Sequence, residues 1–220
     1  IQPDGYVNID QMGKGAYQID NSAYWDFLSE NGFTIYSDVR SNYSSTLVSN
    51  SATFTMKHHY YNNGFNYSEI ANARKVIISD NAVLNSFKKN GYKTHFIAEA
   101  SYLLTNFPKM GYDACNFDYN DIDMITDGFS KEEDITVPLE KFLQEDPDRS
   151  KFFFIEIFKP GHVSSSETQT LGAQKEFELY KENLRLSNER LKKIISMIQE
   201  SDPNGLILIM ADHGGYVGKF

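Results

Sequence analysis

An acidic residue and a histidine stand next to each other after a strongly apolar segment near the end of the chain. Asp212 and His213 follow residues 206–211 (LILIMA) directly. A carboxylate oxygen beside an imidazole nitrogen is a ligand pair suited to Zn²⁺ or Mn²⁺. The alternative is that Asp212 caps a helix and His213 is a loop residue. The pair is therefore a candidate metal site that needs partners from elsewhere in the chain.

Two other polar groups also follow apolar segments. Lys159 and His162 come after residues 152–158 (FFFIEIF), and Asp4 comes after residues 1–3, which we interpret as the tail of a strand. In open α/β sheets, ligands bind beyond the carboxyl ends of the strands, so these side chains can meet there. The competing interpretations are a packing or surface histidine for His162 and a simple Asp-Gly turn at Asp4.

The elements that must position these residues alternate between helix and strand. Helices are predicted over 21–29, 81–89, 136–144 and 176–200, and strands over 33–36, 93–98, 152–158 and 206–211. The type of 41–55 is left open. The runs at 152–158 and 206–211 are typical of strands covered on both faces, and with the long helix between them they predict a parallel βαβ crossover. The fold class is therefore α/β.

Composition limits the possible functions. The 220 residues carry 21 basic and 30 acidic side chains, a formal net charge of −9, which argues against broad nucleic-acid binding. A single cysteine, Cys115, excludes an internal disulfide framework and a cysteine-rich zinc module. No repeat or linker divides the chain, so we predict one domain over residues 1–220. Because the chain starts at Ile1 without a methionine, we expect it to be truncated at the N-terminus, and possibly at the C-terminus, of a longer polypeptide.

Several short motifs in order resemble one known family. They are Asp4-Gly5-Tyr6, residues 20–22 (DNS), Gly32-Phe33, residues 41–49 (SNYSSTLVS), residues 89–94 (KNGYKT), and LILIMADHG after the long helix. Together they resemble the sulfatase-like domain of the alkaline phosphatase superfamily, particularly bacterial membrane-bound transferases of phosphoglycerol or phosphoethanolamine. The resemblance implies a three-layer sandwich with a largely parallel central sheet.

The resemblance also implies a site. Asp4, Thr46, Asp212 and His213 would hold one divalent metal, which we expect to be Zn or Mn, with Mg or Ca as alternatives. Thr46 would be the nucleophile, although Ser44 and Ser45 lie close enough to compete for that role. The residues expected to contact the substrate are His162, Asn42 and Lys159.

The function implied is a metal-dependent phosphotransferase or phosphodiesterase. It would move a phosphoglycerol- or phosphoethanolamine-type group to or from a cell-surface glycan or lipid through a phospho-threonine. One alternative is a sulfatase-type ester hydrolase. Sulfatases proper need a C/S-x-P-x-R motif, and neither Cys115 nor residues 41–49 provide it. The other alternative is a non-catalytic domain that binds an anionic glycan, but all four metal positions hold competent residues.

The resemblance places the domain in the cell envelope, on the extracytoplasmic side of the membrane. The expected partner is a phosphorylated lipid or glycan substrate, with no nucleic acid. Membrane association is expected through a segment that precedes Ile1, because relatives of this type are commonly tethered by N-terminal helices.

Overall fold

A parallel sheet forms the centre of the computed structural model, which describes residues 1–57, 67–122, 128–129, 132–163 and 170–217. The four-stranded sheet has the order β1-β4-β2-β3, and each neighbouring pair is parallel. The strands are β1 (Gln2–Pro3), β2 (Lys93–Ala98), β3 (Ala114–Cys115) and β4 (Lys151–Ile157). The α/β fold class and the parallel sheet are confirmed, and so is the interpretation of residues 1–3 as a strand end.

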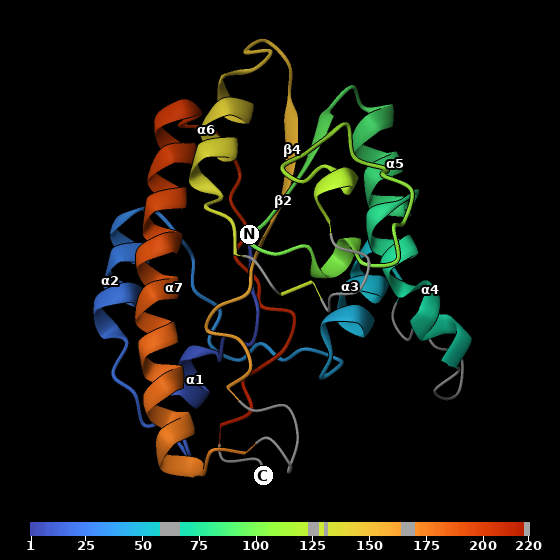
Figure 1. Cartoon of the computed structure of the whole chain (residues 1–220). Coiled ribbons are helices and arrows are strands. Elements are labelled where there is room, and N and C mark those ends of the chain that lie inside the picture. Colours follow the sequence, from blue (N-terminus) through green and yellow to red (C-terminus); the bar gives the residue numbers. More distant parts are fainter. Residues whose placement is uncertain (58–66, 123–127, 130–131, 164–169, 218–220) are drawn as a thin grey trace.

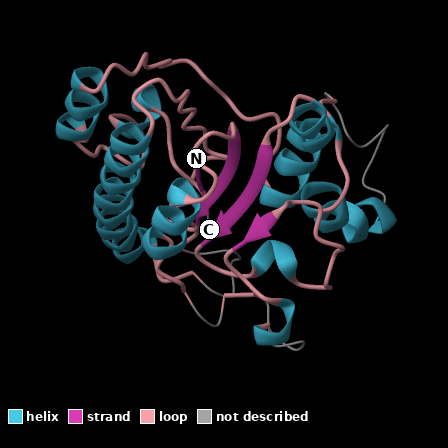
Figure 2. Ribbon diagram, turned by 90° about the horizontal axis from the view of Figure 1, so that it is seen from above, coloured by secondary structure: helices cyan, strands magenta, loops and turns pink. Residues whose placement is uncertain are grey.

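Helices cover both faces of this sheet (Figures 1 and 2). The α-helices are α1 (Ile9–Met12), α2 (Ser22–Glu30), α3 (Thr46–Thr55), α4 (Tyr67–Ile78), α5 (Ala82–Lys89), α6 (Thr136–Gln144) and α7 (Ala173–Ser201). Two 3₁₀ turns, η1 (Tyr102–Leu104) and η2 (Tyr119–Asp121), are also present. Helices α3, α4 and α5 lie on one side of the sheet and α2, α6 and α7 on the other (Figure 1). The three-layer arrangement is therefore confirmed.

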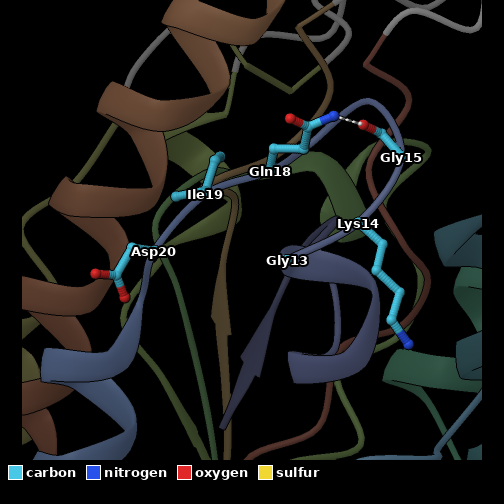
Figure 3. A pocket seen from close by; sticks show the side chains of 6 residues that line it. All are labelled: Gly13, Lys14, Gly15, Gln18, Ile19 and Asp20. Atoms are coloured by element: carbon cyan, nitrogen blue, oxygen red, sulfur yellow. Dashed lines mark hydrogen bonds between the residues drawn. The ribbon is translucent and has the colours of Figure 1, made fainter.

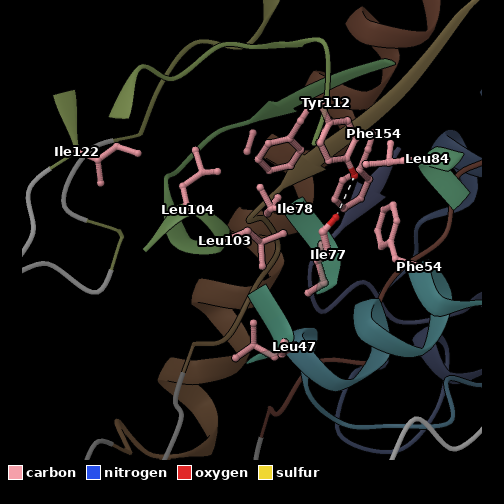
Figure 4. Close-up of a cluster of buried hydrophobic side chains, with 13 residues drawn as sticks. Leu47, Phe54, Ile77, Ile78, Leu84, Leu103, Leu104, Tyr112, Ile122 and Phe154 are labelled. Atoms are coloured by element: carbon pink, nitrogen blue, oxygen red, sulfur yellow. Dashed lines mark hydrogen bonds between the residues drawn. The ribbon is translucent and has the colours of Figure 1, made fainter. Parts of the chain in front are cut away.

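The core between the sheet and α3, α4 and α5 is built from large apolar side chains (Figure 4). Phe54 of α3 and Phe154 of β4 meet edge to face, with ring centroids 4.8 Å apart. Leu47, one residue after Thr46, is buried in the same cluster. Burying these groups removes a large apolar area from water, which is the main favourable contribution to folding. The packing thus fixes the start of α3 against the sheet.

A second core lies on the opposite face, under α6 and α7. It contains Leu191, Ile194 and Ile195 of α7, at the spacing that places them on one side of a helix. They pack against Ile155 and Ile157 of β4. The two faces of β4 are therefore buried in different cores, as the continuous apolar run at 152–158 predicts.

Two predicted strands are absent from the part of the chain that the structure describes. Residues 33–36 form an irregular loop. Residues 206–211 are also not a strand, and the expected βαβ crossover is not completed there. Leu206 and Leu208 are 88% and 69% exposed. The apolar composition of residues 206–211 predicted a strand covered on both faces. That prediction is wrong because only alternate residues, Ile207 and Ile209, pack against the core.

The segment 206–211 nevertheless runs beside β1. The Ile1 amino group donates to Leu208 O (2.7 Å), and Met210 N–H donates to Ile1 O (3.0 Å). These two bonds place Leu208 and Met210 beside the start of β1. Elsewhere the open question of 41–55 is resolved as a helix from Thr46, and the helix predicted over 176–200 is slightly longer. Among the helices described, none combines the length and apolar character needed to cross a membrane.

Candidate metal centre

The candidate ligands come together where β1 and the segment 206–211 end. Asp4 follows β1, and its N–H donates to Ile157 O (2.8 Å), the last residue of the neighbouring β4. Asp212 and His213 follow the segment 206–211, and Thr46 is the first residue of α3. Because β1 and β4 are parallel, their carboxyl ends lie at one edge of the sheet. Residues from opposite ends of the chain therefore share one site.

The distances within this cluster fit a common ion. His213 Nε2 lies 3.2 Å from Asp4 Oδ1, 3.4 Å from Asp212 Oδ2 and 3.3 Å from Thr46 Oγ1. Thr46 Oγ1 and Asp4 Oδ1 are 3.5 Å apart. Two ligands about 2.0–2.1 Å from a tetrahedral zinc ion are themselves roughly 3.3 Å apart. These four separations therefore match the spacing expected around one ion.

One oxygen of the cluster points to the same conclusion. Asp212 Oδ2 is buried, and among the described residues its cationic neighbour is His213 Nε2, 3.4 Å away. Its partner Oδ1 accepts from His213 N–H (2.9 Å) and Gly5 N–H (3.4 Å). A buried carboxylate oxygen without a donor is costly unless a cation or proton satisfies it. The residues present therefore fit a divalent metal.

The pKa values of two residues of the site, His213 and Asp212, are both raised. Burial would lower the pKa of His213, but the hydrogen bond to Asp4 and the charges of Asp212 and Asp4 outweigh it and raise the pKa to about 9. Burial, with the charge of Asp4, raises the pKa of Asp212 to about 6. The metal-free cluster therefore holds a proton on His213 at neutral pH, and a bound metal must displace it.

His213 is fixed in orientation by its neighbours. Its Nδ1 lies 2.8 Å from Gly214 O and donates to that carbonyl, which leaves Nε2 to face the cluster. The ring of Tyr216 stacks on the His213 ring at an interplanar angle of 3°. Only 2% of the His213 side chain is exposed. This is the arrangement expected of a metal-binding imidazole.

Thr46 is positioned through a pair of amide side chains. Gln2, two residues before Asp4, and Asn50, one helical turn after Thr46, exchange two hydrogen bonds of 2.8 Å. Both side chains are buried. The pair ties β1 to α3 directly behind the site and so sets the distance between Asp4 and Thr46. Sequence analysis did not identify it, because nothing in the spacing of Gln2 and Asn50 indicates that they meet.

Glycines allow the Asp4 turn and the His162 loop to approach each other closely. Gly5 has a φ of +64°, and a Cβ on it would lie 3.0 Å from Gly161 O. Gly161 N–H donates to Asp4 O (2.9 Å). A side chain at residue 5 would therefore be strained and would also push the loop away from Asp4.

His162 lies next to the cluster and is more exposed than His213. Its Nε2 is 3.2 Å from His213 Nε2 and 3.8 Å from Asp4 Oδ1, and 28% of its side chain is exposed. Asp4, His162 and His213 each offer one ligand atom within 4.8 Å of the others. The geometry therefore places His162 within reach of an ion held by this cluster.

The other predicted site residues differ in position. Asn42 is exposed and lines a hollow of about 320 Å³ that also borders Asp212. Lys159 forms an ion pair with Glu132 (2.7 Å). Ser44 is exposed, and its carbonyl accepts a hydrogen bond from Tyr216. Of the three competing hydroxyls, that of Thr46 is the one whose described contacts are with Asp4 and His213.

Two features near the cluster were not identified from the sequence. Glu156 of β4 is 1% exposed, and neither of its carboxylate oxygens has a hydrogen-bond partner among the described residues. Burial, together with the charges of Asp212 and Asp4, raises the pKa of Glu156 well above its usual value. The sequence did contain a signal for Glu156, because it is the single acidic residue inside the otherwise apolar segment FFFIEIF. Tyr216, packed against both histidines, carried no such signal.

A larger hollow, of about 500 Å³, shares no residue with this cluster (Figure 3). It lies over the turn after α1 and is lined by Gly13, Lys14, Gly15, Gln18, Ile19 and Asp20. Gln18 Nε2 donates to Gly15 O across this turn (3.0 Å). The chemistry of the chain therefore concentrates at the strand ends rather than at this hollow.

Comparison with known proteins agrees with the fold and the site. The sequence matches the sulfatase family over residues 6–219, so this chain belongs to the sulfatase family. The predicted membership in the sulfatase-like group of the alkaline phosphatase superfamily is confirmed. No curated protein sequence matches the chain.

A solved structure shares the fold. It is the C-terminal periplasmic domain of EcEptC from Escherichia coli, in complex with Zn, with a TM-score of 0.63 and 16% sequence identity. The match covers 97% of this chain and 62% of that chain. At this identity the likeness establishes the fold, and the sulfatase-family membership supports an enzyme of the esterase and transferase type.

Proposed function

We propose that this domain is a divalent-metal-dependent phosphotransferase or phosphodiesterase that works through a phospho-threonine. The observation that carries the proposal is the position of Thr46. Its hydroxyl lies 3.5 Å from Asp4 Oδ1 and 3.3 Å from His213 Nε2, at the first residue of α3. The amide groups in the first turn of a helix favour a transferring phosphoryl group. The proposed nucleophile, the proposed metal ligands and the N-terminal end of α3 therefore lie together.

Asp4, Thr46, Asp212 and His213 are the residues that would hold the metal. A bound divalent ion lowers the pKa of a coordinated hydroxyl and screens the negative charge of a phosphate from its attacker. Zinc or manganese is the metal that we propose, since the set combines two carboxylates, a hydroxyl and an imidazole. The zinc bound to the EcEptC domain supports a divalent ion for this fold.

The reaction has two displacements. The Thr46 hydroxyl gives its proton to water, and its oxygen attacks the phosphorus of a phosphodiester. The bond from phosphorus to the leaving alcohol oxygen breaks, and that oxygen takes up a proton from water. An acceptor hydroxyl, or water, then attacks the phosphothreonine and gives its proton to water, while the bond from phosphorus to Oγ1 breaks and Oγ1 takes up a proton again. We propose that His162 donates to a non-bridging phosphoryl oxygen during both steps. Asn42 would contact the substrate from the hollow beside Asp212.

The substrate class follows from the family resemblance. We propose that the transferred group is of the phosphoglycerol or phosphoethanolamine type and that the acceptor is a cell-surface glycan or lipid. We further propose a location on the extracytoplasmic side of the membrane, which is supported by the periplasmic origin of the EcEptC domain. The absence of a C/S-x-P-x-R motif separates this activity from sulfate-ester hydrolysis.

A pair of simple esters tests the proposal. The metal-free protein is given Zn²⁺ or Mn²⁺ and assayed with bis(4-nitrophenyl) phosphate and with 4-nitrophenyl sulfate. We expect metal-dependent release of nitrophenol from the phosphodiester and little from the sulfate. Faster cleavage of the sulfate would favour the sulfatase alternative. No cleavage of either ester by protein with metal bound would favour a binding domain.

A further inference from the structure

One face of α7 holds the loop that leads from β4 to His162. Asn183, Ser187 and Arg190 are four and three residues apart, so they lie on the same side of the helix. None of them takes part in the metal cluster described above. Asn183 and Ser187 bind the backbone of the loop formed by residues 158–161, and Arg190 acts on it through Glu99.

Two of these side chains bind loop carbonyls directly. Ser187 Oγ donates to Lys159 O (3.0 Å), and Asn183 Nδ2 donates to Pro160 O (3.1 Å). Ser187 is 1% exposed, so its bond lies inside the protein. A carbonyl that loses such a buried donor must move or find water.

The third side chain acts through a carboxylate. Arg190 pairs with Glu99, which follows β2 and is fully buried. Glu99 Oε2 accepts from Phe158 N–H (2.8 Å). Three consecutive loop residues, 158 to 160, are therefore held from the side of α7.

The loop is also held from the side of the metal cluster. Gly161 N–H donates to Asp4 O (2.9 Å), and the next residue is His162. A Cβ on Gly161 would lie 2.5 Å from Phe158 O, which shows how tightly the turn closes. The loop that leads to His162 is therefore tied both to α7 and to Asp4.

We propose that Asn183 and Ser187 are positioning residues that set His162 against the phosphoryl group. What His162 does there rests on the proposed function, whereas the hold of α7 on the loop does not. The donors act through His162 alone, so their loss should reduce turnover without releasing the metal. A misplacement of about 1 Å in such a group can cost up to about 100-fold in rate.

A double-mutant cycle tests the proposal. Ser187→Ala and Asn183→Asp are made in the wild-type and His162→Ala proteins, with Ser196→Ala as the control. Ser196 is an exposed serine on the same helix, and Asn183→Asp keeps the shape of the side chain while removing the donor. The zinc-loaded proteins are assayed for cleavage of bis(4-nitrophenyl) phosphate, zinc content and thermal unfolding.

We expect each loop variant to lower kcat roughly 10-fold in the wild-type background, with unchanged zinc content, and Ser196→Ala to have no effect. In the His162→Ala background, the same substitutions should change kcat less than about twofold, because residues acting as a unit are not additive. Equal losses in both backgrounds, or none in the wild type, would overturn the proposal. Because two different loop variants are tested, a folding defect in one of them does not decide the result.

Binding of inorganic phosphate to the zinc-loaded proteins provides a readout that needs no turnover. If the wild type binds phosphate but cleaves no ester, the proposed function fails and the phosphate affinities decide the positioning role alone. A weakening by Ser187→Ala that disappears in the His162→Ala background supports the role. Unchanged phosphate affinity in the loop variants, or a wild type that neither cleaves ester nor binds phosphate, rejects it.

Discussion

The two histidines of the site are held in different ways. His213 directly follows Asp212, is almost completely buried, and is oriented by the carbonyl of the next residue. His162 is 28% exposed, and its position depends on a loop fixed by α7, more than 20 residues further along the chain. The half of the site around His213 is thus built largely from local geometry at the ends of extended segments. The half around His162 is assembled by distant side chains.

This difference predicts two kinds of functional defect, loss of the metal and loss of turnover. Damage to the Asp4, Asp212 and His213 half should release the metal, because those side chains, together with Thr46, are the proposed ligands. Damage to the His162 half should leave the metal bound and slow the reaction. The variants that follow test whether metal binding and turnover depend on different halves of the site.

The largest effect is expected from Thr46→Ala. The substitution removes the proposed nucleophile, so turnover of a phosphodiester should fall by at least about 1,000-fold. Ser44→Ala should retain most activity, because the Ser44 side chain is exposed and its described contact is through its carbonyl. Steady-state kinetics of both zinc-loaded variants, with circular dichroism to check the fold, decide the matter. An inactive Ser44→Ala beside an active Thr46→Ala would move the nucleophile by two residues.

The next largest effects are expected from replacing each histidine of the site in turn and measuring zinc binding and turnover. His213→Ala should weaken zinc binding by roughly 100-fold or more, because it deletes a ligand. His162→Ala should lower turnover by roughly 10- to 100-fold while the zinc content stays near that of the wild type. Zinc analysis after dialysis, together with kcat, measures both. If His162→Ala loses zinc as readily as His213→Ala, then His162 is a ligand and the proposed division is wrong.

Metal affinity should depend on pH through the protonation of His213 and Asp212. The hydrogen bond to Asp4 and the charges of Asp212 and Asp4 raise the pKa of His213 to about 9, so below that pH a metal must displace one proton. The apparent affinity should therefore rise about tenfold per pH unit up to pH 9 and level off above it. Burial raises the pKa of Asp212 to about 6, so the dependence should steepen below that pH. Competition with a zinc indicator at several pH values gives this curve, and a flat affinity between pH 7 and 9 would contradict it.

The smallest effect concerns stability rather than activity. Burial raises the folded-state pKa of Glu156 well above its unfolded value, so its stabilising contribution is complete at low pH and is lost as the pH rises. Glu156→Gln keeps the shape of the side chain and cannot ionise. The metal-free variant should gain up to about 1.4 kcal/mol per pH unit relative to the wild type above roughly pH 4.3. Urea unfolding across this range measures the difference, and parallel curves would show that Glu156 does not titrate as expected.

The convergence of the two halves of the site was predicted from the sequence, whereas the contacts that hold the His162 loop were not. Asp4, His162, Asp212 and His213 all follow apolar segments, which indicated that they could meet at one edge of the sheet. The sequence could not reveal that α7 holds residues 158–160, since that depends on helix rotation and loop path. The pairing of Gln2 with Asn50 is a contact of the same kind.

The failed strand predictions have a related physical cause. Residues 206–211 are apolar enough for a buried strand, but Leu206 and Leu208 are exposed while Ile207 and Ile209 pack inward. Apolar character alone does not reveal how many faces of a segment are covered. The strand predictions for residues 93–98 and 152–158 were correct because both segments lie inside the sheet, where helices cover both faces (Figure 2).

Trapping the covalent intermediate tests the central claim most directly. The zinc-loaded protein is mixed with a slowly hydrolysed phosphodiester, quenched in acid and digested, and the peptide that contains residues 41–55 is sequenced by mass spectrometry. The account predicts one substituted phosphoryl group, located on Thr46, that is absent without metal and absent in Thr46→Ala. A phosphoryl group on Ser44 or Ser45, or turnover of the same ester by Thr46→Ala at the wild-type rate, would contradict it.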